Sequence, residues 1–376
     1  LPGDSVDLAF ICDAYHHFEV PLKTMTSIHR AMREGGHLAI IDFRRIEGQS
    51  SDWILEHVRA GREVVIKEIE SCGFEFVEAK EILDLIDSIT VPTAVTFHTV
   101  LDQPTRRQRA IIDRLALVAD RLVVMSETGS ARLTRRYGID PGRIQVIPHG
   151  ANTLFSGPSL VSGDRPLVLT WGLIGPGKGL ESAIRAFADL VDLEPAPRYL
   201  IAGATHPHVR ENAGESYRQS LITLALDLGL GHIVEFDDRY LDRAALARLV
   251  RGADVVVLPY SSTEQVTSGV LSEAIAAGKP VIATRFPHAI ELLTGGAGLT
   301  TPHGDAEALA MAIRCVLTDH DVRSRMGREA RRLADGWYWP TIGRRFADLM
   351  TEMAAARSSS VGTRTSPTPE VQRVAG

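Results

Sequence analysis

Short apolar runs alternate with amphipathic segments along most of the chain. Runs such as residues 6–12, 166–172 and 254–260 have the length of buried strands, and the segments between them carry apolar residues at helical spacing. Strands that alternate with helices are typical of βαβ units and parallel sheets. We therefore expect an α/β fold with two Rossmann-like domains, of which the first has a truncated or composite parallel sheet.

The first alternation covers about the first 150 residues. Its expected strands are residues 6–12, 37–43, 74–79, 93–100, 121–126 and 143–150, and its expected helices are residues 21–33, 50–72, 106–119 and 128–138. A segment rich in Ser, Gly and Pro, residues 155–165, predicts a domain boundary.

A second alternation follows that boundary. Its expected strands are residues 166–172, 198–203, 233–236, 254–260 and 280–284, and its expected helices are residues 180–192, 216–228, 244–251, 269–277 and 305–318. So many βα steps in one segment predict a doubly wound domain. The last residues, 357–376, are rich in Ser, Thr and Pro and are expected to be a disordered tail.

Composition narrows the class of protein. The length of 376 residues predicts two domains, and the net charge of −6 argues against a nucleic-acid partner. Cys12, Cys72 and Cys315 lie far apart, which excludes a cysteine zinc site or a disulfide framework and favours a cytoplasmic setting. No apolar run is long enough for a transmembrane segment. The sequence does not indicate an oligomeric state.

A glycine-rich loop follows the expected strand 166–172. Gly172, Gly175, Gly177 and Gly179 allow backbone amides to approach an anion, and Lys178 adds a positive charge. The loop has neither the Walker order nor the G-x-G-x-x-G order. From the loop alone, an ordinary βα turn with a solvated lysine is about as good an interpretation as a phosphate site.

A second candidate segment follows the expected strand 254–260. Ser268 and Gly269 open a helix whose amides could meet a phosphate, and Glu273 presents a carboxylate one turn later that could accept hydrogen bonds from a ribose diol. Glu273 could also be an exposed acid favoured by the helix dipole. Because both segments lie at carboxyl ends of strands, where open α/β sheets bind ligands, a joint site is favoured.

These residues carry a resemblance. The segments GPGKG, ARLVRGADVVVLPY, EQVTSGVLSEAIAAGKPVIAT and GLTTPHGDAEALAMAI resemble the nucleotide-sugar domain of GT-B glycosyltransferases of the retaining family 4 type, and the likeness covers about residues 85–356. The resemblance implies two Rossmann-like domains in a GT-B arrangement. It also implies transfer of a sugar from a nucleoside diphosphate sugar, with retention and without a metal, to an acceptor that is a glycan, a lipid or a small molecule.

The family motifs assign roles residue by residue. Lys178 matches the lysine of a basic pair that neutralises the diphosphate leaving group, whereas the arginine of that pair falls at Leu173. Glu273 matches the acid on the ribose. The acid near the donor sugar is replaced by Gln265, with Glu264 one residue out of register, so donor choice is expected to differ.

Further site residues follow from the same resemblance. Lys178, Gln265 and His98 are expected to take part in catalysis, although a lone histidine such as His98 is more often structural. His149 is expected to serve the linker. The residues expected to bind the donor are Gly175, Gly177, Ser268, Gly269, Val270, Leu271 and Glu273. Ser126 and Glu127 are interpreted as a helix N-cap, and the aromatic residues 337–339 as packing groups before a last helix that crosses back to the first domain.

The first 83 residues resemble another family. The segment LPGDSVDLAFICDAYHHFEVPLKTMTSIHRAMREGGHLAIIDFRRI is similar to the second half of a class I methyltransferase that uses S-adenosylmethionine. The glycine-rich cofactor loop of that family is not found here, so no cofactor is expected and S-adenosylmethionine is disfavoured. Asp13, His16 and His17 would be site residues in an intact enzyme, but orphaned loop residues are the favoured interpretation.

The expected organisation is a hybrid chain. It comprises a methyltransferase-like C-terminal fragment (1–83), a truncated acceptor-side domain (84–155), a nucleotide-sugar domain (156–338), a helix that crosses back (339–356) and the tail (357–376). We expect the strands of residues 6–77 to join those of residues 92–148 in one composite sheet, because an exposed strand edge invites aggregation. The favoured function is a glycosyltransferase. The alternatives are a nucleotide-binding protein without transfer activity, because its acceptor half is replaced, and, less favoured, an active methyltransferase.

Overall fold

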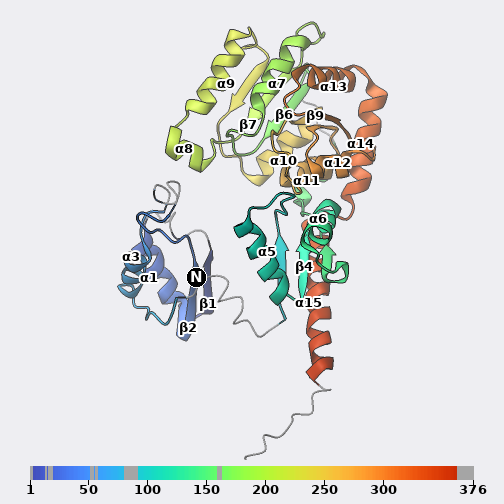
Figure 1. The fold of residues 1–376 in the computed structure, drawn as a ribbon. Coiled ribbons are helices and arrows are strands. Elements are labelled where there is room, and N and C mark those ends of the chain that lie inside the picture. Colours follow the sequence, from blue (N-terminus) through green and yellow to red (C-terminus); the bar gives the residue numbers. More distant parts are fainter. Residues whose placement is uncertain are drawn as a thin grey trace, which may run out of the picture. The chain divides into compact units, whose positions relative to one another are not determined.

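The computed structural model describes residues 3–12, 15, 20–50, 55, 58–79, 92–158 and 163–361 (Figure 1). The chain divides into two compact units, Leu1–Ile89 and Thr90–Gly376, and each is described by itself below. The predicted boundary near Leu83 lies outside the described residues, as does the tail from residue 362 onward. In the part of the chain that the structure describes, no helix combines the length and the hydropathy that a membrane span requires.

The first unit is built around two parallel strands. Its elements are β1 (Val6–Cys12), α1 (Pro21–Ala31), β2 (Met32–Ile41) and α3 (Arg62–Glu70). Strands β1 and β2 pair in parallel, and α1 connects them. A small core gathers Ile11, Tyr15 and Met25, with residues of α1 and α3 packed against it. This arrangement confirms one predicted βαβ unit.

Two predictions for the first unit are wrong. The expected strand at residues 74–79 has no regular structure; Phe76 and Val77 face solvent, with Val77 80 % exposed, whereas Phe74 packs on the small core. The apolar alternation there has no neighbouring strand to pair with among the described residues, so it forms no ladder. The expected helix 50–72 is also interrupted, because Gly61 is extended and α3 begins only after it.

The prediction of one composite sheet is also wrong. Among the described residues, β1 and β2 pair only with each other, while β3 (Ala94–Phe97), β4 (Arg121–Val124) and β5 (Ile144–Val146) form a separate parallel sheet in the order β3-β4-β5. A shared sheet needs backbone hydrogen bonds between the two sets of strands, and the structure has two separate ladders instead.

Two helices connect the strands of the three-stranded sheet. They are α5 (Arg106–Val118) and α6 (Glu127–Tyr137). A capping box of Thr105 and Gln108 starts α5, and the Ser126 side chain accepts the Gly129 amide at the start of α6. The N-cap predicted for Ser126 is thereby confirmed.

The second half of this unit is a six-stranded parallel sheet with the order β11-β10-β9-β6-β7-β8. Its strands are β6 (Leu167–Trp171), β7 (Arg198–Ala202), β8 (Val234–Asp237), β9 (Val255–Leu258), β10 (Val281–Thr284) and β11 (Gly298–Thr301). Strands β6, β9 and β10 are buried along their whole length, as expected for a sheet covered on both faces. The predicted doubly wound domain is confirmed.

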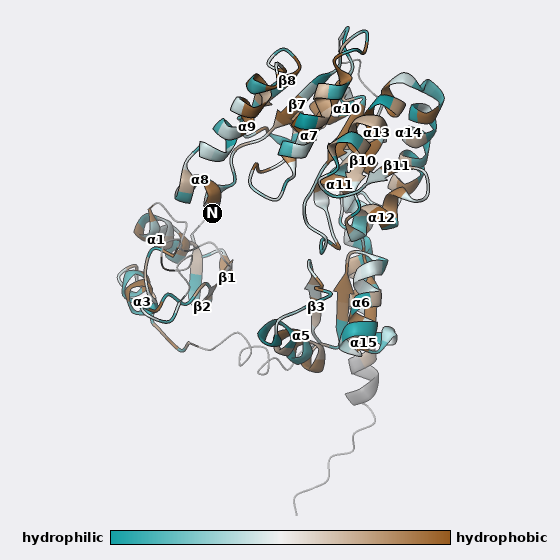
Figure 2. Cartoon of the chain, turned by 45° about the horizontal axis from the view of Figure 1, so that its top comes forward, coloured by the Kyte–Doolittle hydropathy of each residue, from teal (hydrophilic) through white to brown (hydrophobic). Residues whose placement is uncertain are grey.

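Helices cover this sheet. They are α7 (Leu180–Ala186), α8 (Pro207–Ala213), α9 (Ser216–Asp227), α10 (Arg243–Gly252), α11 (Gly269–Ala276), α12 (Pro287–Leu293), α13 (Ala306–Thr318) and α14 (His320–Ala334). Figure 2 shows both hydrophilic and hydrophobic residues on such helices, as expected where one side packs on a sheet. The sequence pattern does not predict α8, α12 and α14; the first two have seven residues each, too few to show a clear period.

The last helix, α15 (Trp339–Val361), returns to the three-stranded sheet (Figure 1). Ile342, Leu349 and Met353 form a buried cluster with Val123 of β4 and Ile147. This confirms the expected crossing. The helix continues to Val361, so the first residues of the predicted tail are helical, because a serine run need not end a helix that is already formed.

We predict that Ile342→Ala destabilises this unit by about 2–5 kcal/mol, because truncation of a fully buried side chain leaves a cavity between α15 and the sheet. Met350→Ala on the same helix is the control, since Met350 is 43 % exposed. Urea denaturation of both variants measures the difference. Equal midpoints for the two variants would contradict the packing of α15.

Candidate functional site

The glycine-rich loop after β6 is held by close backbone packing. Gly179 has a φ of +66°, and a Cβ at this position would overlap the carbonyl oxygen of Pro259. The Ser261 amide donates to the Gly177 carbonyl at 3.0 Å. Both contacts join the loop after β6 to the segment after β9, the neighbouring strand. Glycine at 179 is therefore required by the packing of the site.

Lys178 lies over an aromatic ring. Its Nζ is 4.6 Å from the centre of the Tyr260 ring, a cation–π distance. Burial lowers the pKa of Lys178. Burial raises the pKa of Tyr260, and its buried hydroxyl has no hydrogen-bond partner among the described residues. Lys178 thus contacts the segment after β9, and a Cβ on Gly172 would lie 3.8 Å from the Val270 side chain of α11, so the two candidate segments meet.

The N-terminus of α11 offers backbone amides at this place. Ser268 is the N-cap, and its hydroxyl accepts the Leu271 amide at 3.2 Å. The Ser268 amide donates to Nδ1 of His288 at 2.9 Å. Within the described part of the chain, the amides of Gly269 and Val270 have no acceptor. These two amides are therefore the ones that could meet an anion, while Leu271 and Ser268 already have partners.

Glu273 lies one turn into α11 and is partly buried. Its Oε2 accepts the indole N–H of Trp171 at 3.4 Å. Burial raises the pKa of Glu273, with Trp171 and Arg243 acting in the opposite direction. A carboxylate with one weak neutral donor retains free acceptor positions, and hydroxyl groups could fill them.

Gln265 and Glu264 have separate surroundings. The Gln265 side chain donates to the Thr267 carbonyl at 3.1 Å. Glu264 instead accepts from Arg132 at 2.7 Å and from the Asp102 amide at 2.9 Å, both in the part that contains the three-stranded sheet. The acid that is one residue out of register is therefore bound to the other half of the unit, and it does not replace Gln265.

The remaining predicted residues are placed as follows. Gly175 is buried and packs near Val209, and Leu173 is 39 % exposed. His98 is exposed at the end of β3. His149, expected to serve the linker, lies directly against the candidate site, because a Cβ on Gly269 would be 3.0 Å from its Cε1. Burial lowers the pKa of His149, and His98 adds to this effect.

Sequence reasoning missed three contributors to the site. His288 holds the Ser268 amide, Tyr260 connects the two segments, and Trp171 donates to Glu273. Tyr260 and Trp171 each end or follow a strand at its carboxyl end, which is the signal that could have identified them. His288 had no comparable signal, because its partner is 20 residues away.

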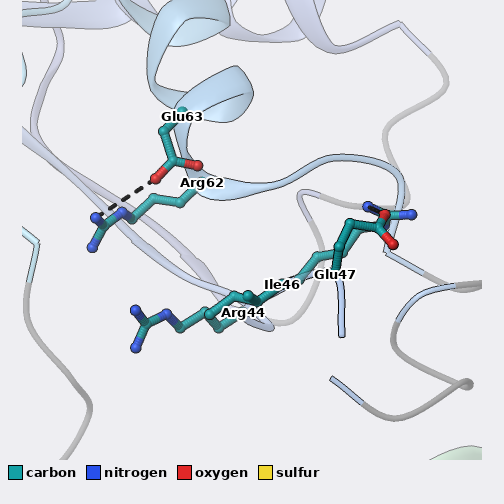
Figure 3. Close-up of a pocket in the computed structure, with 6 residues that line it drawn as sticks. Arg44, Ile46, Glu47, Arg62 and Glu63 are labelled. Atoms are coloured by element: carbon teal, nitrogen blue, oxygen red, sulfur yellow. Dashed lines mark hydrogen bonds and ion pairs between the residues drawn. The ribbon is translucent and has the colours of Figure 1, made fainter. Parts of the chain in front are cut away.

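The first unit holds a separate pocket of about 320 Å³ (Figure 3). It is lined by Arg44, Arg45, Ile46, Glu47, Arg62 and Glu63. Arg45 pairs with Glu47 at 2.6 Å, and Arg62 lies 3.7 Å from Glu63. Arginine and glutamate side chains of the pocket thus pair with each other, and none of the predicted site residues lines it.

Asp13, His16 and His17, the candidate residues of the methyltransferase-like segment, lie outside the described residues. Among all residues that the structure describes, no group of three or more His, Cys, Asp or Glu side chains could hold a metal ion.

Three family models match parts of the chain. The family Glycosyl transferases group 1 matches residues 154–333, and the family Glycosyltransferase Family 4 matches residues 77–154. Residues 77–333 thus match two glycosyltransferase families in succession. The family Methyltransferase domain matches residues 1–40. The methyltransferase match is thus at the N-terminal end of this chain and ends well before residue 83. That residues 1–83 correspond to the C-terminal part of a methyltransferase domain stays a prediction.

Several curated proteins of the same name are similar to this chain. D-inositol 3-phosphate glycosyltransferase of Corynebacterium efficiens is 28 % identical over 295 residues, which are 71 % of this chain and 67 % of the relative. The protein of the same name from Corynebacterium kroppenstedtii is 30 % identical over 299 residues, 70 % of this chain and 63 % of the relative. The chain thus spans about two thirds of the length of these relatives.

Solved structures establish the fold as GT-B. Sucrose-phosphate synthase from Thermosynechococcus elongatus matches with a TM-score of 0.64 and 19 % identity, covering 93 % of this chain and 100 % of that one. Anabaena HepE in complex with UDP matches with a TM-score of 0.64 and 18 % identity, covering 92 % and 100 %. The α/β fold with parallel sheets that the sequence predicted is confirmed.

We predict that Gly179→Ala destabilises the second unit by about 3 kcal/mol or more, because the new methyl group would overlap the Pro259 carbonyl in a left-handed backbone. Gly177→Ala is the control. It also has a positive φ, but nothing lies within 4 Å of the added Cβ. Its expected cost is about 1 kcal/mol. Chemical denaturation compares the two, and similar losses would contradict the close approach.

A pH dependence follows from His288. Burial lowers the pKa of His288 to about 4, below its ordinary value of 6.5. Between these values the unfolded chain binds more protons than the folded one, so stability falls as the pH falls, by up to about 1.4 kcal/mol per pH unit. His149 acts in the same direction.

We predict that His288→Asn, which keeps an acceptor for the Ser268 amide, makes the stability less dependent on pH between 6.5 and 4. Urea denaturation at several pH values measures the slope. His232→Asn serves as the control, because His232 is exposed and its substitution should leave the slope unchanged. An unchanged slope in His288→Asn would show that His288 does not titrate in this window.

Proposed function

We propose that the chain is a glycosyltransferase that transfers a sugar from a nucleoside diphosphate sugar with retention of configuration and without a metal ion. The observation that carries the proposal is that the end of β6 and its glycine-rich loop, with Lys178, lie against α11 through Trp171–Glu273 and Gly172–Val270, which brings a cation, two free amides and a carboxylate to one place. A cation and two amides suit a diphosphate, and a carboxylate with free acceptor positions suits a ribose diol. The structural relative HepE was solved in complex with UDP, which supports this class of donor.

In this proposal Lys178 stabilises the leaving group. When the bond between the sugar and the diphosphate breaks, negative charge grows on the phosphate oxygens, and a positioned ammonium group lowers the energy of that state. The amides of Gly269 and Val270 add two donors, while Gly175 and Gly177 let the loop approach the phosphates. Leu173 stands where the family has a second cation, so Lys178 acts without that arginine.

Gln265 and His98 are proposed to contact the sugar. Gln265 stands where the family has an acid. Its side-chain amide can form a hydrogen bond with a sugar hydroxyl group, and the change from acid to amide favours a different donor sugar. His98 comes from the end of β3, in the part that contains the three-stranded sheet. No cofactor is proposed, and the cytoplasmic setting stays an expectation drawn from the cysteines.

The acceptor is proposed to be polyhydroxylated. The curated relatives are named for D-inositol 3-phosphate, and the structural relative for sucrose phosphate, which makes inositol phosphates and sugar phosphates the first compounds to assay. Glycans and lipids are the next compounds in that panel.

A second candidate is a nucleotide-binding protein without transfer activity. Residues 1–40 match a methyltransferase domain, and the glycosyltransferase match begins only at residue 77. The acceptor half of the relatives is therefore not matched over its whole length. An assay of transfer, separate from an assay of binding, distinguishes the two candidates.

We predict that UDP or GDP stabilises the protein in a thermal-shift assay, by about 2.7 kcal/mol at a hundredfold excess over the dissociation constant. S-adenosylmethionine should have no effect. Lys178→Ala should weaken nucleotide binding by about tenfold to a hundredfold, because one charge-assisted contact to the phosphates is lost. Lys23→Ala is the control, since Lys23 is exposed in the first unit.

The outcomes separate the candidates. Binding together with transfer or hydrolysis of the donor supports the glycosyltransferase. Binding without turnover on the whole acceptor panel supports the second candidate. Stabilisation by S-adenosylmethionine and by neither nucleotide would overturn both and favour a methyltransferase.

A further inference from the structure

Glu264 connects the two halves of the second unit. Its Oε2 accepts from Arg132 Nη1 at 2.7 Å and from the Asp102 amide at 2.9 Å. Arg132 belongs to α6 and also donates to the Glu264 carbonyl at 3.2 Å. The Arg132 side chain is 13 % exposed, so water screens this pair less than it screens an open surface pair.

On one side of this connection lies the loop after β3, residues 98–102, which begins with His98. Arg132 donates to the Val100 carbonyl in this loop at 2.8 Å. The Asp102 carboxylate pairs with Arg136 through contacts of 2.7 and 3.1 Å. Arg132 and Arg136 of α6, together with Glu264, therefore determine the position of the loop that carries His98.

On the other side lies the loop before α11. Glu264 is followed directly by Gln265, whose side chain bonds to the Thr267 carbonyl. Val266 is 2 % exposed and belongs to the buried cluster of the three-stranded sheet, together with Phe97 and Val100. The loop that carries Gln265 is thus anchored on both sides, by Val266 in the core and by Glu264 on Arg132.

We propose that Glu264 is a positioning residue that holds the loop carrying His98 against the loop carrying Gln265, so that both groups face the same donor sugar. This inference rests on the proposed function. Both donors, Arg132 and the Asp102 amide, bind Oε2 of Glu264, which fixes this carboxylate toward the three-stranded sheet. A carboxylate suits this role because it accepts from a guanidinium and a backbone amide at once and carries the opposite charge to Arg132.

The chain contains a matched control. Glu291 of α12 also joins the two halves, because its carboxylate accepts the amides of Glu127 and Thr128, both at 2.9 Å, and the Thr128 hydroxyl at 2.7 Å. These contacts lie at the start of α6, and none of them involves residues 98–102 or 264–268. Glu291→Gln therefore weakens a connection of the same kind whose carboxylate makes no direct contact with either loop.

The experiment compares Glu264→Gln and Glu291→Gln in the full chain. Hydrogen exchange measured by mass spectrometry reports on residues 98–102 and 264–268, and UDP titration reports on donor binding. Turnover is measured with UDP-glucose and GDP-mannose, using the one that the wild type hydrolyses faster. Glu264→Asp, a shorter carboxylate, tests for partial rescue.

We expect Glu264→Gln to speed exchange in both loops about tenfold and to lower kcat about tenfold to a hundredfold, because small misplacements of reacting groups cost that much. UDP affinity should stay within about threefold, since Lys178 and Glu273 are not displaced. Glu291→Gln should speed exchange only at the start of α6 and leave kcat nearly unchanged, and Glu264→Asp should recover part of kcat.

Two results would overturn the inference. One is unchanged exchange at residues 98–102 in Glu264→Gln, and the other is an equal loss of kcat in Glu291→Gln. If the wild type neither binds UDP or GDP nor hydrolyses either donor, the proposed function fails. The exchange measurement still decides, in that case, whether Glu264 holds the two loops together.

Discussion

The candidate site depends on one close approach between two backbone segments. Gly179, at the end of the loop after β6, packs on the Pro259 carbonyl at the end of β9 with no room for a side chain. Beside this contact, Lys178 lies with its Nζ over the Tyr260 ring. Neighbouring parallel strands bring the two loops to one edge of the sheet. Glycine at 179 then lets the loops come close enough for one diphosphate to contact both.

Many strands and helices of the second unit could be predicted from the sequence, because each is determined by residues within its own segment. Strands β6, β9 and β10 are continuous apolar runs, and α5 and α10 show clear helical periods, so each element is determined by its own residues. The order of the motifs then indicated that Lys178 and Glu273 share a site. The position of Ser268 as an N-cap also follows from its residue type.

What could not be predicted depends on partners far away in the chain. Residues 74–79 alternate like a strand, but whether they pair depends on a neighbour that the pattern does not reveal. The same holds for the composite sheet, which requires backbone registry between segments that form separate ladders. Glu264 shows the limit at the level of one residue. Its contact with Arg132 spans 132 residues, and no local pattern distinguishes a donor-site acid from one that joins two halves of the fold.

The electrostatics of the site show how it could be prepared for a nucleotide. Burial lowers the pKa of Lys178 and raises that of Glu273, so in each case the surroundings disfavour the charged form. Glu264 differs, because its carboxylate forms an ion pair with Arg132. A diphosphate beside Lys178 would favour the charged ammonium, and hydroxyl donors on Glu273 would favour the charged carboxylate.

The ligand would thus supply the charged and hydrogen-bonding partners that Lys178 and Glu273 lack within the described part of the free protein. The resulting interactions would be stronger than at an exposed surface, because water is partly excluded from both groups. Glu264 and Glu273 differ in the donors that the fold gives them, since Oε2 of Glu264 accepts from a guanidinium and a backbone amide, whereas Oε2 of Glu273 accepts, among the described residues, only from the neutral indole of Trp171.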